Sequence, residues 1–383
     1  MTAHVFVVSS LTFDLHLKHL FVGTGSKDHQ VDFNSNTISV LHASSEKMLA
    51  SMLADAARLR AGDAVYFYVQ QDSHSEGRFY GIFECVDDGA FLDVKDKTQY
   101  LRNELEKNLN IRALIKPREV FAEGISEWEL LDDISSLTKP YQLIWSLIYR
   151  KLKGNRGNTM ITLYEEKQIE TKLRQKNSQS IKFPSQSFFT FNTLEGKIEL
   201  GKGKFNYQGS STKINLMPRL KYKYEKGEAF EAHLQAVIVD SILKGSNKSL
   251  DDSIFENHIL EWLGNEVSCG VGMQRIDILT QTRFTDKTII SPIELKAVPF
   301  QLKNLKQVQR YIDWLRLYYV PTMPGVIRPI LITKDLESSE ELSESVFYEK
   351  VNEFNHINSD CAPLVWVTFK FKGSNLSFSA KSY

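Results

Sequence analysis

Two acidic residues and a lysine, carried by two short apolar runs, are the residues of this chain best suited to chemistry. The first run, residues 275–279, reads Arg-Ile-Asp-Ile-Leu, and the second, residues 292–296, reads Pro-Ile-Glu-Leu-Lys. Asp277 and Glu294 could together hold a divalent metal ion, and Lys296 could polarise or deprotonate a water molecule. This set of groups is typical of metal-dependent hydrolysis of a phosphodiester bond.

The spacing of these residues predicts two adjacent antiparallel strands. Side chains alternate between the two faces of a strand, so Glu294 and Lys296 point to the same side while the apolar residues next to them enter a core. Asp277 has the same setting in the preceding strand, and the polar residues 281–287 are interpreted as the connecting loop. We therefore expect Asp277 beside Glu294 and Lys296 on one face of a sheet.

The charges of this group predict a cation between the carboxylates. Two neighbouring carboxylates repel when both are ionised, so the pKa of one of them rises unless a cation separates them. Mg²⁺ prefers oxygen ligands and keeps several of its waters, and we expect Mn²⁺ to substitute for it. Lys296 would orient or deprotonate the attacking water, or stabilise charge that develops on phosphorus. A Glu-x-Lys pair by itself is ordinarily an exposed ion pair, and the upstream Asp277 and a downstream helix favour the nuclease interpretation.

That helix is predicted over residues 303–319. Its apolar positions recur at helical spacing and define one buried stripe: Leu305, Val308, Ile312, Leu315 and Tyr319. Gln307 and Tyr311 are one turn apart on a neighbouring strip, so they can act together. The alternative is that both belong to the polar flank of an amphipathic helix, with Tyr311 capping the core.

The order Asp…Glu-x-Lys followed by Gln-x-x-x-Tyr resembles the PD-(D/E)XK nucleases that carry the RecB-type extra motif, in particular the C-terminal domain of the NucS (EndoMS) endonucleases. The resemblance covers about residues 245–335. It implies that Asp277 and Glu294 are metal ligands and that Lys296 is the catalytic lysine. It also implies that Gln307 and Tyr311 are accessory active-site residues. The family often adds an acidic residue on the helix before the first strand, for which Asp251 and Glu256 are both candidates.

The N-terminal part of the chain has the pattern of a separate unit. Strands are predicted at residues 4–8, 64–69 and 78–86, and a helix is predicted at residues 47–59. A Gly-Asp pair, a strand, a polar loop and a strand that begins Gly-Arg-Phe-Tyr-Gly-Ile-Phe-Glu resemble the PUA-like barrels, particularly the EVE and YTH group. This resemblance spans about residues 1–165.

The PUA-like resemblance implies a domain that reads a nucleobase, typically a modified one, by stacking and hydrogen bonding in an aromatic pocket. Four aromatic residues are candidates for that pocket, with core packing as the alternative for each: Phe13, Tyr66, Tyr68 and Trp145. Ser9 and Ser10 follow the first strand, where they could contact a base or serve as ordinary turn residues.

Residues 166–226 are predicted to be a linker with short strands, because their composition is polar and rich in Gly, Ser and Lys. Six basic residues, interleaved with aromatic ones, follow one another here: Lys202, Lys204, Lys213, Arg219, Lys221 and Lys223. They could follow the phosphates of a nucleic acid, or they could belong to a solvated edge hairpin. A helix at residues 228–243 is expected to open the nuclease domain, and residues 364–371 are predicted to form a late strand.

Composition limits the class of protein. A chain of 383 residues is expected to form two or three domains. Lys+Arg and Asp+Glu both number 47, so no overall charge attracts nucleic acid and any such attraction is local. Cys85, Cys269 and Cys361 are widely spaced, which indicates buried thiols rather than disulfides or a zinc site. Neither a signal-peptide pattern nor a membrane-length apolar run is found, so a soluble, cytoplasmic protein without membrane contact is expected.

Together these patterns predict an α/β (α+β) protein. Residues 1–165 would form a PUA-like β-barrel with helices, 166–226 a linker with short strands, and 227–383 a restriction-endonuclease-like mixed sheet flanked by helices. The expected function is Mg²⁺-dependent cleavage of DNA, directed to a modified or extruded base as in modification-dependent restriction or defence. The alternatives are a NucS-like nuclease for mismatched or branched DNA and a non-catalytic nucleic-acid-binding protein, and RNA stays open as a substrate. A duplex cut needs two active sites, so a homodimer is also considered.

Overall fold

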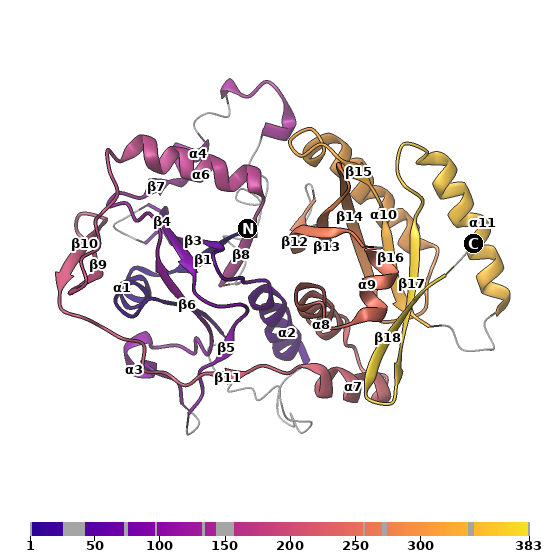
Figure 1. Cartoon of the computed structure of the whole chain (residues 1–383), viewed down its shortest axis with the longest axis horizontal. Coiled ribbons are helices and arrows are strands. Elements are labelled where there is room, and N and C mark those ends of the chain that lie inside the picture. The colour runs from indigo at the N-terminus through magenta and orange to yellow at the C-terminus, as the bar shows by residue number, and fades with distance from the viewer. Residues whose placement is uncertain are drawn as a thin grey trace. The chain divides into compact units, whose positions relative to one another are not determined.

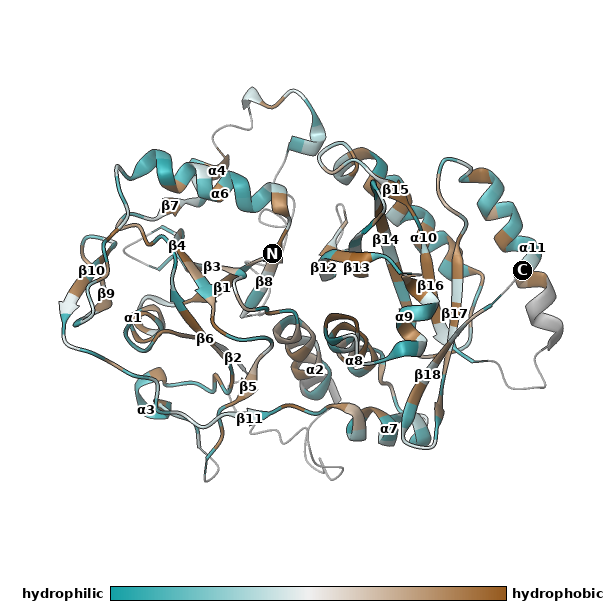
Figure 2. Ribbon diagram, in the orientation of Figure 1, coloured by the Kyte–Doolittle hydropathy of each residue, from teal (hydrophilic) through white to brown (hydrophobic). Residues whose placement is uncertain are grey.

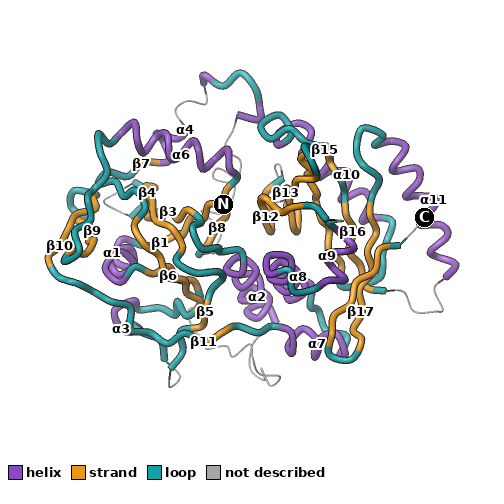
Figure 3. Tube along the Cα trace, viewed as in Figure 1, coloured by secondary structure: helices purple, strands orange, loops and turns teal. Residues whose placement is uncertain are grey.

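The computed structural model describes residues 2–25, 43–72, 76–95, 98–131, 135–142, 157–255, 257–269, 274–335 and 341–381. The chain divides into two compact units, the first formed by Met1–Thr138 with Ser146–Asn215 and the second by Lys139–Trp145 with Leu216–Tyr383 (Figure 1). Residues 166–215 therefore belong to the first unit rather than to a linker. Both units combine sheets with helices, as predicted for the mixed α/β class (Figure 3).

The first unit is built on a mixed sheet. Its described strands are β1 (Ala3–Val8), β2 (Phe21–Thr24), β3 (Ala64–Val69), β4 (Arg78–Cys85), β5 (Phe91–Leu92), β6 (Ile111–Pro117), β7 (Ile125–Ser126), β8 (Asn158–Ile161) and β11 (Thr212–Lys213). They pair in the order β11-β5-β6-β4-β3-β1-β8, with β2 beside β6 and β7 beside β4. The strands of the predicted PUA-like β-barrel do not close into a barrel in the described part of the chain. The strands β11 and β8 lie at the two ends of the order, where they pair with β5 and β1 and not with each other.

A hairpin after the last helix of this unit completes its core. The described helices are α1 (Ser10–His19), α2 (Ala43–Ala57), α3 (Arg102–Leu105), α4 (Glu127–Leu131) and α6 (Leu163–Lys176). The hairpin consists of β9 (Ser187–Asn192) and β10 (Lys197–Lys202), and β9 packs against α1. It places Phe189 and Ile198 in the same hydrophobic cluster as Phe13 and Phe67. These buried side chains explain why this segment folds with the first unit.

The second unit is a mixed sheet flanked by helices, as predicted. Its described strands are β12 (Ile259–Ser268), β13 (Arg275–Phe284), β14 (Lys287–Lys296), β15 (Val326–Ile327), β16 (Ile330–Lys334), β17 (Val365–Lys372) and β18 (Asn375–Ala380). The order is β12-β13-β14-β16-β17-β18, with β15 beside β14. The strands β14, β16 and β17 are parallel to one another, and the remaining pairs on this path are antiparallel. Figure 2 shows β13, β14 and β16 as mainly hydrophobic, which is expected for strands covered on both faces.

The described helices of the second unit pack on both the antiparallel and the parallel parts of this sheet. They are α7 (Met217–Lys226), α8 (Glu231–Lys244), α9 (Lys248–Ile254), α10 (Lys303–Trp314) and α11 (Glu341–Ile357), with a 3₁₀ turn η2 (Pro140–Gln142) and a π-helical turn η3 (Leu315–Tyr319). The helix α8 contacts β13 and β14, α10 contacts β14, and α9 contacts β17 and β18. The predicted helix over residues 303–319 is thus found as α10 continued by η3, and all five residues of its apolar stripe are buried.

The connection between the two strands of the candidate site is shorter than predicted. The strand β13 continues through Phe284 and β14 begins at Lys287, so two residues rather than residues 281–287 form the turn. Gln281 and Thr282 are buried, and they pair with the backbone of β14. The loop was predicted from the polar residue types alone. In the structure, the buried side-chain amide of Gln281 donates a hydrogen bond to Glu261 on β12, so this polar group can be buried in the sheet.

The basic stretch is also different from the prediction. Residues 217–226 form the helix α7 rather than a strand, with Pro218 in its first turn and Gly227, at φ 67°, as its C-cap. Pro fits the first turn of a helix and Gly the left-handed cap, so the local sequence favours this helix. The six basic residues are divided accordingly, since residues up to 215 belong to the first unit and α7 belongs to the second.

Candidate active site

The antiparallel pairing of β13 and β14 brings the predicted acidic residues together. Ile278 on β13 lies opposite Ile293 on β14. The next residues outward along the two strands are therefore Asp277 and Glu294, and Lys296 follows on the same face as Glu294. The expected arrangement of one aspartate beside a Glu-x-Lys pair is present in the structure.

Asp277 is held in place by two neighbouring elements. Its Oδ2 accepts a hydrogen bond from the backbone N–H of Leu295 on β14, with an N–O distance of 2.8 Å. Its backbone carbonyl accepts a hydrogen bond of 2.8 Å from Nε2 of Gln235, a buried residue on α8. Asp277 itself is partly buried. Its carboxylate is thus fixed from the strand beside it, and its backbone is fixed from the helix that packs on the sheet.

Glu294 is the deepest residue of the site, since its side chain has no solvent exposure. Lys296 Nζ lies 2.5 Å from its Oε1. This is a close contact of opposite charges, yet Oε1 is a buried oxygen that accepts no hydrogen bond of normal geometry from the described residues. The other oxygen, Oε2, lies 2.7 Å from the hydroxyl of Tyr311.

Tyr311 and Gln307 join the site through Glu294. The Tyr311 hydroxyl accepts a hydrogen bond of 2.8 Å from Nε2 of Gln307. It also lies 2.8 Å from the backbone carbonyl of Arg275 and 2.7 Å from Glu294 Oε2. A hydroxyl has one proton, so it can donate fully to one of these two oxygens. When Glu294 is protonated, that carboxyl can donate to Tyr311, which can then donate to the Arg275 carbonyl.

The pKa values of both carboxyl groups are raised. Burial raises the pKa of Asp277 well above its ordinary value, and the negative charge of Glu294 raises it further. Burial also raises the pKa of Glu294, although the charge of Lys296, its close contact with Oε1 and the hydrogen bond with Tyr311 oppose this shift. Burial and the repulsion between like charges therefore both act here, and the second is the repulsion that the sequence predicts.

Lys296 is a cation in this setting. Burial lowers its pKa, but the carboxylates of Glu294 and Asp277 raise it more, so the net shift is upward. A lysine with a raised pKa keeps its proton at neutral pH and acts as a charged hydrogen-bond donor. The raised pKa of Lys296 therefore favours a role in orienting a water or stabilising negative charge over a role in removing a proton.

The sequence did not identify one acidic residue near this lysine. Glu231, in the first turn of α8, has its Oε1 3.7 Å from Lys296 Nζ, and its side chain is 46% exposed. Of the two acidic residues considered for this place, Asp251 lies on α9, which packs against β17 and β18, and Glu256 is outside the described residues. The sequence offered one signal for Glu231, which is an acidic residue near the start of the predicted helix at 228–243 and one turn before Gln235.

The donor set fits a hard divalent cation. Among the described residues, no group of three or more His, Cys, Asp or Glu side chains is arranged to hold a metal ion. Mg²⁺ does not need such a group, because it commonly uses one or two carboxylates and keeps its waters. Asp277, Glu294 and Glu231 surround a single ammonium, so ionised carboxylates leave an excess of negative charge. Oε1 of Glu294, which Lys296 Nζ contacts at 2.5 Å, is a candidate ligand atom.

In the first unit, the aromatic residues considered for a base pocket are buried. Phe13 packs against Phe67 and Tyr80, with ring centroids 5.1 and 5.2 Å away. Tyr66 and Tyr68 are 0% and 5% exposed, which also indicates core packing. Trp145 lies outside the described residues. Ser9 is the N-cap of α1 and takes part in a capping box, so its role is that of a turn residue.

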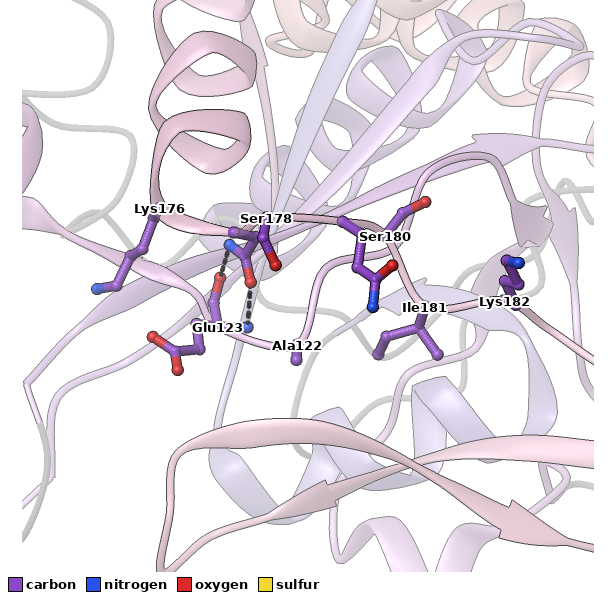
Figure 4. Close-up of a pocket in the computed structure, with 9 residues that line it drawn as sticks. Ala122, Glu123, Lys176, Ser178, Ser180, Ile181 and Lys182 are labelled. Atoms are coloured by element: carbon purple, nitrogen blue, oxygen red, sulfur yellow. Dashed lines mark hydrogen bonds between the residues drawn. The ribbon is translucent and has the colours of Figure 1, made fainter.

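A polar cavity of about 580 Å³ lies at the end of α6 in the first unit (Figure 4). Its wall is held by Asn177, which accepts a hydrogen bond from the backbone N–H of Glu123 and donates one to the Glu123 carbonyl. The lining consists of residues 122–123 and 176–182, and it contains no aromatic side chain. Stacking on a flipped base needs an aromatic or other flat surface, so this cavity does not have the composition of a base pocket.

No protein-family model matches this chain, and no curated protein matches it. Among solved structures, a hypothetical protein from Leishmania major is 14% identical, with a TM-score of 0.28, over 46% of this chain and 98% of its own. Human THYN1 protein, solved with 5-methylcytosine containing DNA, is 9% identical, with a TM-score of 0.26, over 45% of this chain and 98% of its own. The MspJI restriction endonuclease, solved with a 27-mer oligonucleotide, is 10% identical, with a TM-score of 0.22, over 94% of this chain and 72% of its own. Similarity at this level does not establish a shared fold.

No helix in the described part of the chain combines the length and the apolar character that crossing a membrane requires.

Proposed function

We propose that this protein is a magnesium-dependent DNA endonuclease whose active site is built on β13, β14 and α10. The observation that carries the proposal is the contact between Glu294, Lys296 and Tyr311 beside Asp277, in a buried site with more negative than positive charge. An uncompensated buried charge is destabilising, and carboxyl groups with perturbed pKa values cluster at functional sites. The motif resemblance to the PD-(D/E)XK nucleases supports the same assignment.

Each residue has a distinct role in this proposal. Asp277 and Glu294 would hold the metal ion, which when bound supplies electrostatic stabilisation to a phosphate oxygen. Lys296, as a cation, would donate to the attacking water or to an oxygen of the reacting phosphate. Tyr311, held by Gln307, keeps the Glu294 carboxylate in one orientation. The backbone N–H of Leu295 does the same for Asp277.

The proposal includes selection of a modified or extruded base by the first unit. This part rests on the resemblance of the Gly-Asp, strand and loop pattern to the EVE and YTH group. The buried Phe13, Tyr66 and Tyr68 and the polar cavity at the end of α6 are not used for it. The selecting surface is therefore proposed to lie elsewhere in the first unit.

The test is a cleavage panel with the full chain and Mg²⁺. The duplexes share one sequence and are unmodified, methylated, hydroxymethylated, glucosylated, mismatched or branched. We expect metal-dependent cutting of a base-modified duplex and none in EDTA. Preference for the mismatched or branched duplex would instead indicate a repair nuclease.

The site assignment is tested on the duplex that is cut best. Glu294→Gln and Lys296→Met should each lower the rate by roughly 10²–10⁴-fold. Glu261→Gln is the matched control, because Glu261 lies on β12 and is ion-paired with Arg283. Calorimetry should show weaker Mg²⁺ binding for Glu294→Gln than for the control. Unchanged cleavage in both site variants would reject the site.

A further inference from the structure

One face of α10 carries three exposed basic residues: Lys303, Lys306 and Arg310. We call them the α10 basic face. All three are exposed, and within the described residues none of them forms an ion pair. The remaining charged residue of α10, Asp313, receives a hydrogen bond from Gln309 and is ion-paired with Arg316. The basic face is therefore an uncompensated concentration of positive charge in a chain whose net charge is zero.

The positions of Lys303 and Lys306, in the first turn of α10, are unfavourable for the helix itself. The N-terminus of a helix carries a partial positive charge, which disfavours nearby cations. The first turn of α10 has no acidic residue, and no side chain caps it. The helix α6 shows the usual arrangement, with Thr162 and Glu165 in a capping box and Glu166 in the first turn. An anion bound along α10 would relieve the repulsion that its own sequence leaves in place.

The basic face adjoins the candidate active site. With about 100° of rotation per residue, Arg310 and Lys303 lie about 60° and about 40° around the helix from Gln307. Tyr311 lies about 40° beyond Gln307 on its other side, and it contacts Glu294. The basic residues, Gln307 and Tyr311 therefore lie side by side on one side of the helix, and Tyr311 contacts the acidic site.

Arg310 and both carboxylates act on the same buried thiol, that of Cys269. Burial raises the pKa of the Cys269 thiol to about 12, the charge of Arg310 lowers it, and the charges of Glu294 and Asp277 raise it. One buried thiol therefore senses Arg310 and both carboxylates together. This agrees with the helical positions.

The dimensions fit one strand of a duplex. Lys303 and Arg310 are separated by about 10 Å along the helix axis, at about 1.5 Å per residue. One strand of a DNA duplex carries a phosphate charge about every 3.4 Å along its axis. Neighbouring phosphates are farther apart than this rise, because the strand winds round the axis, so the face could meet about two or three phosphates.

We propose that the α10 basic face binds the phosphates of the DNA strand next to the bond that is cut, and so sets the register of that strand over Asp277 and Glu294. This inference rests on the proposed nuclease function, because it assigns the substrate surface of the same site.

The test measures binding without cleavage. The variant is Lys303→Gln/Lys306→Gln/Arg310→Gln, and the matched control is Lys226→Gln/Lys287→Gln/Lys372→Gln, which removes three exposed cations of the second unit outside α10. Fluorescence anisotropy with a duplex oligonucleotide in EDTA, at several salt concentrations, gives the affinity and its salt dependence. For the face variant we expect about tenfold or greater loss of affinity, and a slope of log affinity against log salt that is smaller by about 2–3. The control should leave the slope unchanged, and the unfolding temperature of the face variant should be unchanged or higher.

The outcomes separate this inference from the proposed function. Cleavage by the wild type, with an unchanged slope in the face variant, overturns the surface and leaves the nuclease in place. A smaller slope in the face variant, with no cleavage of any duplex in Mg²⁺, supports the surface and rejects the nuclease. Equal losses in the face and control variants overturn the surface, since general charge then explains binding. A change of slope on duplex RNA alone overturns the assignment to DNA.

Discussion

Each unit buries a cluster of charged side chains, and the two clusters differ in how completely their charges are balanced. In the first unit, Arg112 is fully buried and lies 2.6 Å from Asp93. Arg112 also donates to the carbonyls of Leu109 and Tyr100, while Asp93 accepts from the hydroxyl of Tyr207. The backbone N–H and side chain of Ser210 donate to the other oxygen of Asp93. One cation meets one anion, and the surrounding donors and acceptors are paired.

The cluster of the second unit is left incomplete. Glu294 and Asp277 share one close ammonium, that of Lys296, and Glu294 Oε1 accepts no hydrogen bond from the described residues. A balanced buried network mainly specifies structure, whereas a poorly balanced one lowers stability and is retained where chemistry needs it. The comparison therefore separates a structural ion pair from a candidate active site without reference to any ligand.

The largest expected effect is on the balanced cluster. Arg112→Met should destabilise the first unit by about 3–5 kcal/mol, because Asp93 would remain buried without its partner. Denaturant unfolding of the full chain, followed by signals of both units, measures this loss. The double variant Arg112→Met/Asp93→Leu should recover part of it. A cost below about 1 kcal/mol for the single variant would contradict the contrast between the clusters.

A smaller effect is expected from Tyr311→Phe on cleavage. The variant removes the hydroxyl that contacts Glu294 and the Arg275 carbonyl, so the rate should fall by about 10–100-fold, equivalent to about 1.4–2.8 kcal/mol. Tyr319→Phe on the adjoining η3 turn is the control, and its rate should stay within a fewfold of the wild type. Equal rates for Tyr311→Phe and the wild type would show that Tyr311 only fills the core.

Asp277→Asn should stabilise the metal-free protein while it abolishes cleavage. The amide oxygen can still accept from Leu295, but the repulsion with Glu294 is removed, and a gain of about 0.5–2 kcal/mol is expected. Because the pKa of Asp277 is raised on folding, the folded wild type binds more protons and loses stability as pH rises from about 3.8 to that raised value. The gain should thus be absent below about pH 3.8 and complete above the raised pKa. Thermal unfolding across this pH range checks it, and a gain that shrinks with rising pH would oppose it.

The smallest effect is expected for Glu231→Gln. Glu231 is half exposed and 3.7 Å from Lys296, so solvent screens the pair and its loss should cost less than about 1 kcal/mol. The cleavage rate should fall by less than about fivefold, and the difference should vanish at high salt. A loss of 100-fold or more would indicate that Glu231 is a metal ligand, and it would enlarge the incomplete cluster by one carboxylate.

Local periodicity predicted the parts of the fold that depend on a few neighbouring residues. The strand at 64–69 has the same bounds as β3, and the helix over 303–319 is present as α10 and η3. The alternation in 292–296 placed Glu294 and Lys296 on one face, as β14 does. These predictions hold because face and spacing are set by the geometry of the backbone. Polar composition was a poorer guide, since it assigned Gln281 to a loop although this residue is paired in the sheet. It also set residues 166–226 apart as a linker, although β9 and β10 fold with the first unit.

By itself the sequence determined which residue types could carry chemistry and on which face of a strand they lie. Tertiary structure alone decided that Glu231 rather than Asp251 reaches Lys296, that Phe189 completes the core of the first unit, and that Tyr207 bonds to Asp93 from 114 residues away. The reason is physical. A strand or helix imposes its period within a few residues, whereas burial, charge balance and the choice of partner depend on which distant elements pack together.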